Sequence, residues 1–68
     1  MRYLVRIFNI FTHKVTHVEP FYYEFELDNY IKSCRLQEYE AILVREISTY
    51  NVTNYLYDRE TGSYTMIV

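Results

Sequence analysis

The stretch 21–36 changes its hydrophobic period partway along, and this change limits the folds open to the chain. Residues 21–27 alternate with a period of two, which is typical of a strand with one buried face. The apolar side of this alternation consists of Phe21, Tyr23, Phe25 and Leu27. The apolar positions that continue with the helical period are Leu27, Tyr30, Ile31 and Cys34. We therefore expect a strand over 21–27 that leads directly into a helix ending near Leu36, with Asp28 as its N-cap.

Two other segments are apolar on both faces, which is typical of interior strands. The first is 2–12, and its faces consist of Tyr3, Val5, Ile7 and Phe11 on one side and Leu4, Phe8 and Ile10 on the other. The second is 40–48, which contains the run Ala41–Val44. Between the first of these and the strand over 21–27, His13-Lys14 is the predicted turn. Pro20 indicates a bulge or an edge position in the returning strand.

The rest of the chain predicts two further strands and a turn. Residues 52–57 are rich in Thr, Tyr and Val, which favour strands. Residues 58–62 run from Asp to Gly and predict a turn, so 63–68 form a fifth strand or an arm that pairs elsewhere. The predicted fold class is α+β: a small, mainly antiparallel sheet with one short helix, in the order ββαββ with or without a fifth strand. The 68 residues form a single small domain, 1–68.

The predicted helix is too short to cover the predicted sheet. At about 1.5 Å per residue it spans roughly 14 Å, enough for one face of about three strands. The apolar residues expected to face away from it are Leu4, Phe8, Ile10, Ile42 and Val44. A monomer does not usually expose a patch of this kind. We therefore expect either this set or the edge 64–68 to form the interface of a homo-oligomer, first of all a dimer, or to be covered by another protein.

Cysteine content and charge limit the compartment and the partners. Cys34 is the only cysteine, so no internal disulfide forms, and its place on the apolar stripe predicts a buried, reduced thiol suited to the cytoplasm. The net charge is −2, which is not the basic character of a nonspecific nucleic-acid binder. The N-terminal apolar run contains Arg2 and Arg6 and resembles neither a signal peptide nor a membrane span, so we expect no membrane association.

No combination of residues in the sequence predicts a metal site. His13 and His17 have the spacing of a zinc pair on a helix, but their segment is predicted to be turn and strand. Two residues four apart on a strand lie about 13 Å apart, which is too far to bind one ion. We therefore expect no metal and no other cofactor. A single glycine also leaves no phosphate-binding loop.

We also expect no catalytic residues and no enzyme activity. Glu24 and Glu26 share the polar face of the predicted strand, where we interpret them as solvent-facing charges paired with Arg6 or Lys14 across the hairpin. Paired carboxylates can act as acid and base, but nothing else in the sequence supports that role here. Cys34 is predicted on the buried side of the helix, without a histidine nearby in sequence, and is not expected to be a nucleophile.

The nine tyrosines are the main compositional excess. Tyr22, Tyr55 and Tyr57 fall on strand faces where the core pattern does not require them. Tyrosine is favoured in binding surfaces, so these three residues, with Arg45 and Arg59, form the predicted partner-binding set. The alternative is that the tyrosines serve cross-strand packing within the sheet.

The function predicted from these features is that of a non-enzymatic protein–protein interaction module. A small, tyrosine-rich chain whose frequent residues have AT-rich codons is typical of phage and mobile-element products. The partner would then be a host factor, such as a polymerase, a repair enzyme or a defence system, inhibited or modulated in the host cytoplasm. One alternative is an oligomer that binds a nucleotide at its interface. Another is a single-stranded nucleic-acid binder that stacks bases on aromatic residues, for which the basic residues are few.

Overall fold

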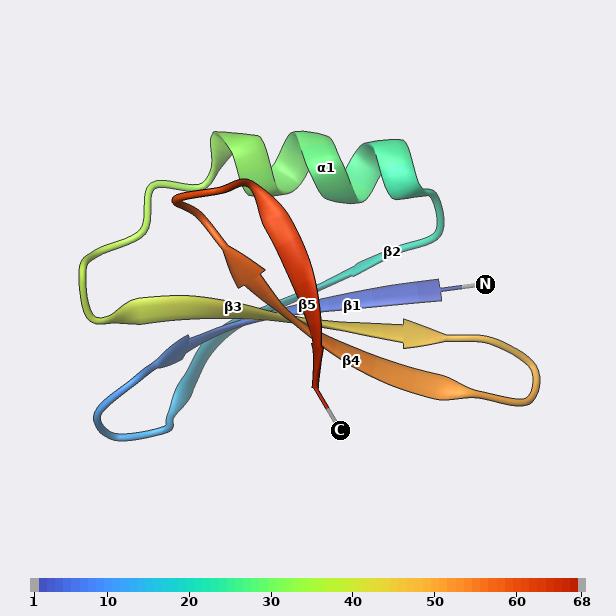
Figure 1. Ribbon diagram of the computed structural model, residues 1–68, viewed down its shortest axis with the longest axis horizontal. Helices are drawn as coiled ribbons and strands as arrows, with labels where there is room; N and C mark the ends of the chain where they lie inside the picture. The colour runs from blue at the N-terminus through green and yellow to red at the C-terminus, as the bar shows by residue number, and fades with distance from the viewer. Residues whose placement is uncertain (1, 68) are drawn as a thin grey trace.

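The computed structural model describes residues 2–67 and has an α+β architecture. One helix lies on one face of a five-stranded sheet with the strand order β2-β1-β3-β4-β5 (Figure 1). The elements are β1 (Arg2–Asn9), β2 (Val15–Phe21), α1 (Glu24–Ser33), β3 (Glu40–Ile47), β4 (Val52–Asp58) and β5 (Ser63–Ile67). Every neighbouring pair of strands is antiparallel. The predicted fold class is confirmed, and the predicted fifth strand pairs with β4; Val68 lies outside the described residues.

The core lies between α1 and the face of the sheet that it covers. In the register of β1 and β3, Val5 is opposite Val44 and Ile7 is opposite Ile42, so all four side chains share one face. Val5 and Ile42 are 0% and 1% exposed. The buried residues are Tyr3, Val5, Ile7, Leu27, Ile31, Ile42 and Val44. The described core thus consists of five residues from one face of the sheet and of Leu27 and Ile31 from the helix that packs on it.

The helix begins earlier than the sequence predicts. It starts at Glu24 after Tyr23, whose backbone is extended and whose side chain makes no capping hydrogen bond. The predictions of a strand over 21–27 and of Asp28 as N-cap are therefore wrong, since β2 ends at Phe21 and Asp28 lies inside α1. Two glutamates in the first turn stabilise this early start, because negative charge is favourable at a helix N-terminus.

The other boundaries agree more closely with the sequence pattern. The strand predicted over 2–12 ends at Asn9, because the Asn9 side chain accepts hydrogen bonds from the amides of Phe11 and Thr12 and turns the chain. Pro20 lies in an edge strand, where its missing amide proton costs least. The predicted turn at 58–62 is confirmed: Gly62 has a φ of 71° and its amide donates to the Asp58 carbonyl at 2.8 Å.

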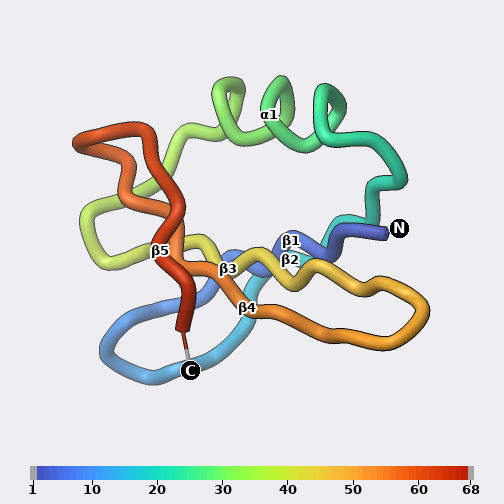
Figure 2. Tube along the Cα trace, turned by 45° about the vertical axis from the view of Figure 1, so that its right-hand side comes forward, coloured from blue at the N-terminus to red at the C-terminus, as the bar shows by residue number. Residues whose placement is uncertain are grey.

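The helix covers one side of the sheet and leaves the other uncovered. It packs against β1 and β2, and the turn between β4 and β5 reaches toward its C-terminal half (Figure 2). In the described part of the chain, no helix lies against the opposite side of the sheet (Figures 1 and 2). We call that side the open face.

Candidate functional site

The open face is largely apolar. The β1–β3 register pairs Leu4 with Arg45, Arg6 with Leu43 and Phe8 with Ala41, and the next strand adds Leu56 opposite Leu43. The strand register also puts charged residues at the ends of this face, Arg2 in β1 and Asp58 in β4. Across the sheet, the open face consists of Val15, Val18, Pro20, Arg2, Leu4, Arg6, Phe8, Ala41, Leu43, Arg45, Ile47, Val52, Asn54, Leu56, Asp58, Ser63, Thr65 and Ile67. Val18, Leu56 and Ile67 are 48%, 38% and 42% exposed. The face thus presents apolar side chains to solvent across several strands.

Two arginines lie at the centre of this apolar surface. Burial and the neighbouring Arg45 charge lower the pKa of Arg6 below its ordinary value. The Arg6 Nε atom is buried and has no hydrogen-bond partner among residues 2–67. The Nε of Arg45 donates to Oδ1 of Asn54 at 3.1 Å. The only ion pair found among the described residues joins His17 to Glu19, so no carboxylate in this range pairs with either arginine.

The expected pairing of Arg6 with Glu24 and Glu26 is wrong because the helix begins earlier than the sequence predicts. Glu24 and Glu26 belong to α1 and not to β2. They therefore lie on the helix side of the sheet, while Arg6 lies on the other side. Within 2–67, no aspartate or glutamate therefore forms an ion pair with Arg6.

The apolar residues predicted to face away from the helix divide between the two sides of the sheet. Leu4 and Phe8 lie on the open face as expected. Ile42 and Val44 do not, because they are buried beneath α1 at 1% and 2% exposure. The run 41–44 is apolar at every position, so its alternation alone could not decide which side chains face the core. Ile10 follows the end of β1 in the turn and is 41% exposed.

The predicted partner-binding tyrosines lie on the helix side or beyond the sheet. Tyr55 and Tyr57 are half-buried and pack against the core. Their rings contact that of Tyr64, with centroids 6.4 Å and 5.2 Å apart. Tyr22 lies between β2 and α1 and is 65% exposed. Tyr55 and Tyr57 therefore pack across strands, as the alternative interpretation of the tyrosines predicts.

The two predicted arginines are also separated. Arg45 lies on the open face, whereas Arg59 lies in the turn between β4 and β5. The Arg59 guanidinium donates to backbone carbonyls of the loop between α1 and β3, including that of Gln37 at 3.1 Å. Arg59 therefore joins two connecting segments, and the five residues of the predicted set do not form one surface.

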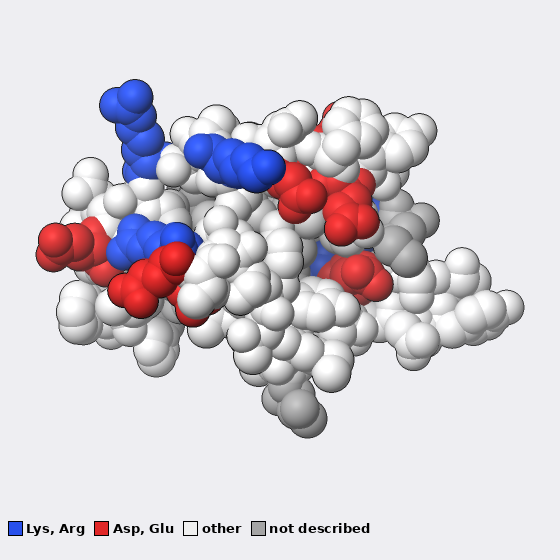
Figure 3. Space-filling model, turned by 45° about the horizontal axis from the view of Figure 1, so that its top comes forward, with Lys and Arg blue, Asp and Glu red and all other residues white. Residues whose placement is uncertain are grey.

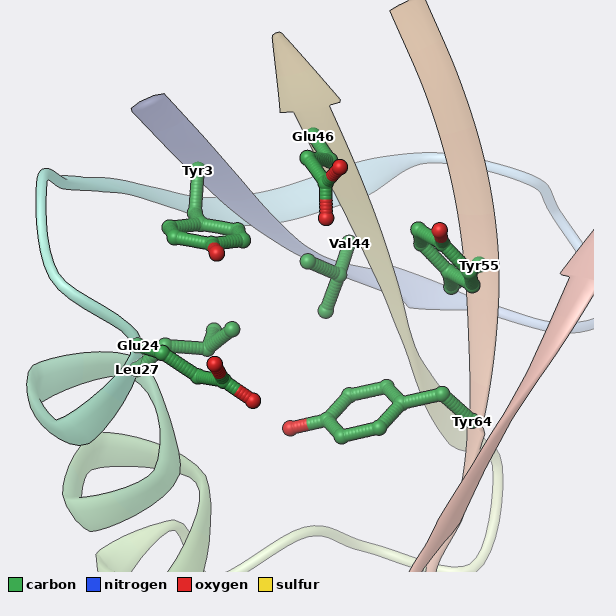
Figure 4. A pocket seen from close by; sticks show the side chains of 7 residues that line it. All are labelled: Tyr3, Glu24, Leu27, Val44, Glu46, Tyr55 and Tyr64. Carbon is green, nitrogen blue, oxygen red and sulfur yellow. The ribbon is translucent and has the colours of Figure 1, made fainter. Parts of the chain in front are cut away.

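A small cleft lies between α1 and the sheet on the helix side (Figure 4). Its volume is about 210 Å³, and it is lined by Tyr3, Glu24, Leu27, Val44, Glu46, Tyr55 and Tyr64. We call it the tyrosine cleft. The Tyr64 hydroxyl donates to Oδ1 of Asp28 at 3.1 Å. Burial, followed by this hydrogen bond, raises the pKa of Tyr64 above its ordinary value.

Sequence patterns did not identify the tyrosine cleft, because its walls come from five separate elements. The wall residues are Glu24 in α1, Tyr3 in β1, Glu46 in β3, Tyr55 in β4 and Tyr64 in β5. Only the way in which the sheet and the helix pack brings these elements together. Alternation within β4 places Tyr55 and Tyr57 on one face, but it does not indicate which face the helix covers.

The histidines and the cysteine lie outside both surfaces. His17 contacts Glu19 on the exposed strand β2 at 3.0 Å, and His13 lies in the preceding turn with a φ of 62°. Within 2–67, no group of three or more His, Cys, Asp or Glu side chains could hold a metal ion. Cys34 is half-buried beside the core, and burial raises the pKa of its thiol.

Comparisons with protein-family models, with curated protein sequences and with solved structures found no match to this chain. In the range 2–67, α1 is too short and too polar to cross a membrane. The open face and the tyrosine cleft are therefore the observations from which a function can be inferred.

Proposed function

We propose that the protein is a non-enzymatic interaction module that binds a partner protein through the open face. The observation that carries this proposal is the pair Arg6 and Arg45, which lies within a largely apolar surface and forms no ion pair with a carboxylate among the described residues. The partner surface that fits is apolar and contains an aspartate or glutamate opposite the two guanidinium groups.

The energetics favour such a partner. A buried polar atom without a hydrogen-bond partner costs free energy, and the Arg6 Nε is such an atom. A partner carboxylate can accept hydrogen bonds from a guanidinium and compensates its charge. The surrounding leucines lose contact with water when a partner covers them, at roughly 25 cal/mol per Å² of apolar area. Apolar contact thus supplies affinity, and the arginines supply selectivity.

A second copy of the chain fits this surface less well. Two open faces related by a two-fold axis through their centre would bring four guanidinium groups together without a compensating charge. We therefore favour a different, acidic partner over the predicted homodimer. Dimerisation through Leu4 and Phe8 remains an outcome that the experiment below can detect.

The identity of the target rests on composition alone. We retain the prediction of a host-cell factor in the cytoplasm, which the module inhibits or modulates by covering a functional surface. The expectation of a phage or mobile-element source supports this, as does the single cysteine, Cys34, which suits a reducing compartment. The arginine pair also suits a phosphate group, so nucleotides and single-stranded oligonucleotides belong in the same test.

The experiment compares two charge reversals that differ in location. Arg45→Glu changes the open face, whereas Arg35→Glu changes an exposed residue between α1 and β3. Tagged wild-type protein and both variants are used to capture proteins from a host lysate, and the affinity of each captured protein is then measured. We expect capture by the wild type and by Arg35→Glu, and loss of capture by Arg45→Glu.

Three results would contradict the proposal. The first is equal binding of the partner by both variants. The second is a wild-type dimer in sedimentation velocity that Leu43→Asp dissociates, since the open face would then bind its own copy. The third is a thermal shift with nucleotides or oligonucleotides that Arg45→Glu abolishes, which would favour the ligand-binding alternatives.

A further inference from the structure

We propose that the tyrosine cleft binds an alkylammonium group, of the kind found at the end of a lysine side chain or of a free aliphatic diamine. The cleft lies on the helix side of the sheet, opposite the open face, so this proposal does not depend on the one above. It rests on a cavity with an apolar floor, aromatic walls and two carboxylates.

The carboxylates come from opposite walls. Glu24 belongs to the first turn of α1 and Glu46 belongs to β3. Figure 4 shows both side chains directed into the space between the helix and the sheet. No lysine or arginine among residues 2–67 forms an ion pair with either of them. Lys32 lines a neighbouring pocket with Glu24 but forms no ion pair with it, so both carboxylates of the cleft are without an ion pair in the described structure.

Acidic side chains also gather around this end of the helix (Figure 3). The helix contributes Glu24, Glu26 and Asp28, and Glu46 lines the cleft with Glu24. Three of these carboxylates act on Tyr3 in the core, because the charges of Glu46, Glu24 and Asp28, after burial, raise the pKa of its hydroxyl. The negative potential thus extends into the cleft as well as over its rim.

The remaining lining matches both parts of an alkylammonium ion. Leu27 and Val44 provide an apolar surface for methylene groups. An ammonium group has three donors and no acceptor, and the oxygen atoms of Glu24 and Glu46 are acceptors. The rings of Tyr3 and Tyr55 stand at the sides of the same space (Figure 4), where aromatic faces attract a cation.

The size and chemistry of the cleft exclude nucleotides, phosphate and divalent metal ions. Its volume of about 210 Å³ is below the roughly 300–1,000 Å³ of pockets for drug-sized molecules, so it fits one side chain and not a nucleotide. Phosphate is negatively charged and would be repelled by the carboxylates of Glu24 and Glu46. Calcium and magnesium require about six oxygen ligands, and the cleft has two carboxylates.

The first test is a titration followed by amide NMR shifts, with probes that separate charge from chain length. The probes are butylammonium chloride, Nα-acetyl-lysine amide and putrescine, with 1-butanol and potassium chloride as controls. We expect saturable shifts at Leu27, Val44 and Tyr64 with the ammonium probes and no saturable shift with either control. Tighter binding of the lysine amide identifies a protein side chain as the ligand, and tighter binding of putrescine identifies a free diamine. Absence of saturation with all three ammonium probes, or equal binding of 1-butanol, would overturn the proposal.

The second test removes charge without changing shape. Glu46→Gln is compared with Glu38→Gln, which changes an exposed residue in the loop before β3. We expect butylammonium to bind Glu46→Gln about tenfold more weakly and Glu38→Gln with wild-type affinity. Unchanged affinity of a folded Glu46→Gln variant would refute the role of the carboxylate. Arg45→Glu should retain butylammonium binding, so failure of one proposal is distinguishable from failure of the other.

Discussion

The Tyr64 hydroxyl donates a hydrogen bond of 3.1 Å to Oδ1 of Asp28 and thereby joins the edge strand β5 to the helix α1. The rings of Tyr55 and Tyr57 contact the Tyr64 ring from the neighbouring strand. One edge-strand residue therefore holds together one wall of the tyrosine cleft. Asp28 is an interior residue of α1 and does not cap the helix; its structural role is to accept this hydrogen bond.

Replacing Tyr64 with phenylalanine should lower the free energy of unfolding by about 0.5–1 kcal/mol. The substitution removes the hydrogen bond to Asp28 and keeps the ring contacts, and the value is modest because Tyr64 is 37% exposed. Urea denaturation measures the effect. Tyr50→Phe is the matched control, because Tyr50 is 92% exposed and should change stability by less than about 0.5 kcal/mol. Equal effects of the two substitutions would show that the hydrogen bond does not stabilise the fold.

Stability should fall at alkaline pH because several tyrosines must ionise when the chain unfolds. Burial is the main cause that raises the pKa of Tyr30 to about 12, and it also raises the pKa of Tyr64. The folded protein holds these protons more tightly than the unfolded chain, so the stabilisation is complete below about pH 10. It is lost as the pH rises from about 10 toward 12.

Urea denaturation at a series of alkaline pH values, with absorbance titration of the phenolates, tests this dependence. Tyr30→Phe should reduce the slope of stability against pH in that window. A wild-type stability that stays constant through the window would contradict the account, as would a Tyr30→Phe variant with an unchanged slope.

The early start of α1 can be tested with a pair of helix substitutions. Ile31 is 5% exposed and Phe25 is 65% exposed. Ile31→Ala should therefore cost about 2–4 kcal/mol of unfolding free energy, whereas Phe25→Ala should cost less than about 0.5 kcal/mol. Thermal or urea unfolding distinguishes them. If Phe25→Ala destabilises as much as Ile31→Ala, residue 25 faces the core, as the strand predicted over 21–27 requires.

Cys34 should react slowly with iodoacetamide in the folded protein. Burial raises the pKa of its thiol, and the thiolate is the reactive form. The rate at pH 8 is compared with that of the same chain unfolded in urea. We expect a marked acceleration on unfolding; equal rates in the two states would show that the Cys34 environment does not protect the thiol.

The strands were more predictable from the sequence than the helix boundary. Residues 40–48 and 52–57 are rich in apolar and β-branched side chains, and both form strands close to the predicted limits. Residues 21–27 alternate as a strand does, but Phe25 is exposed and Leu27 is buried with Ile31 on one side of α1. Alternation over so few residues is compatible with both periods, and packing against β1 and β2 favours the helix.

The surfaces were less predictable, because they depend on which side of the sheet the helix covers. The expectation that the helix leaves apolar residues uncovered holds for Leu4 and Phe8 but fails for Ile42 and Val44. Arg6 was expected to pair with Glu24 and Glu26 across the hairpin. These glutamates belong to α1 and not to β2, so the pairing does not form. The tyrosine cleft required long-range contacts, such as that of Tyr64 with Asp28, that local periodicity does not contain.

The most direct test of the interaction module is the affinity of a captured partner for Arg45→Glu and for Arg35→Glu. Arg45 lies beside Arg6 on the open face, and Arg35 is exposed outside it. The account predicts that Arg45→Glu binds the partner at least about tenfold more weakly than wild type, with Arg35→Glu unchanged. Equal affinity of the two variants would contradict the claim that the open face and its arginine pair bind the partner.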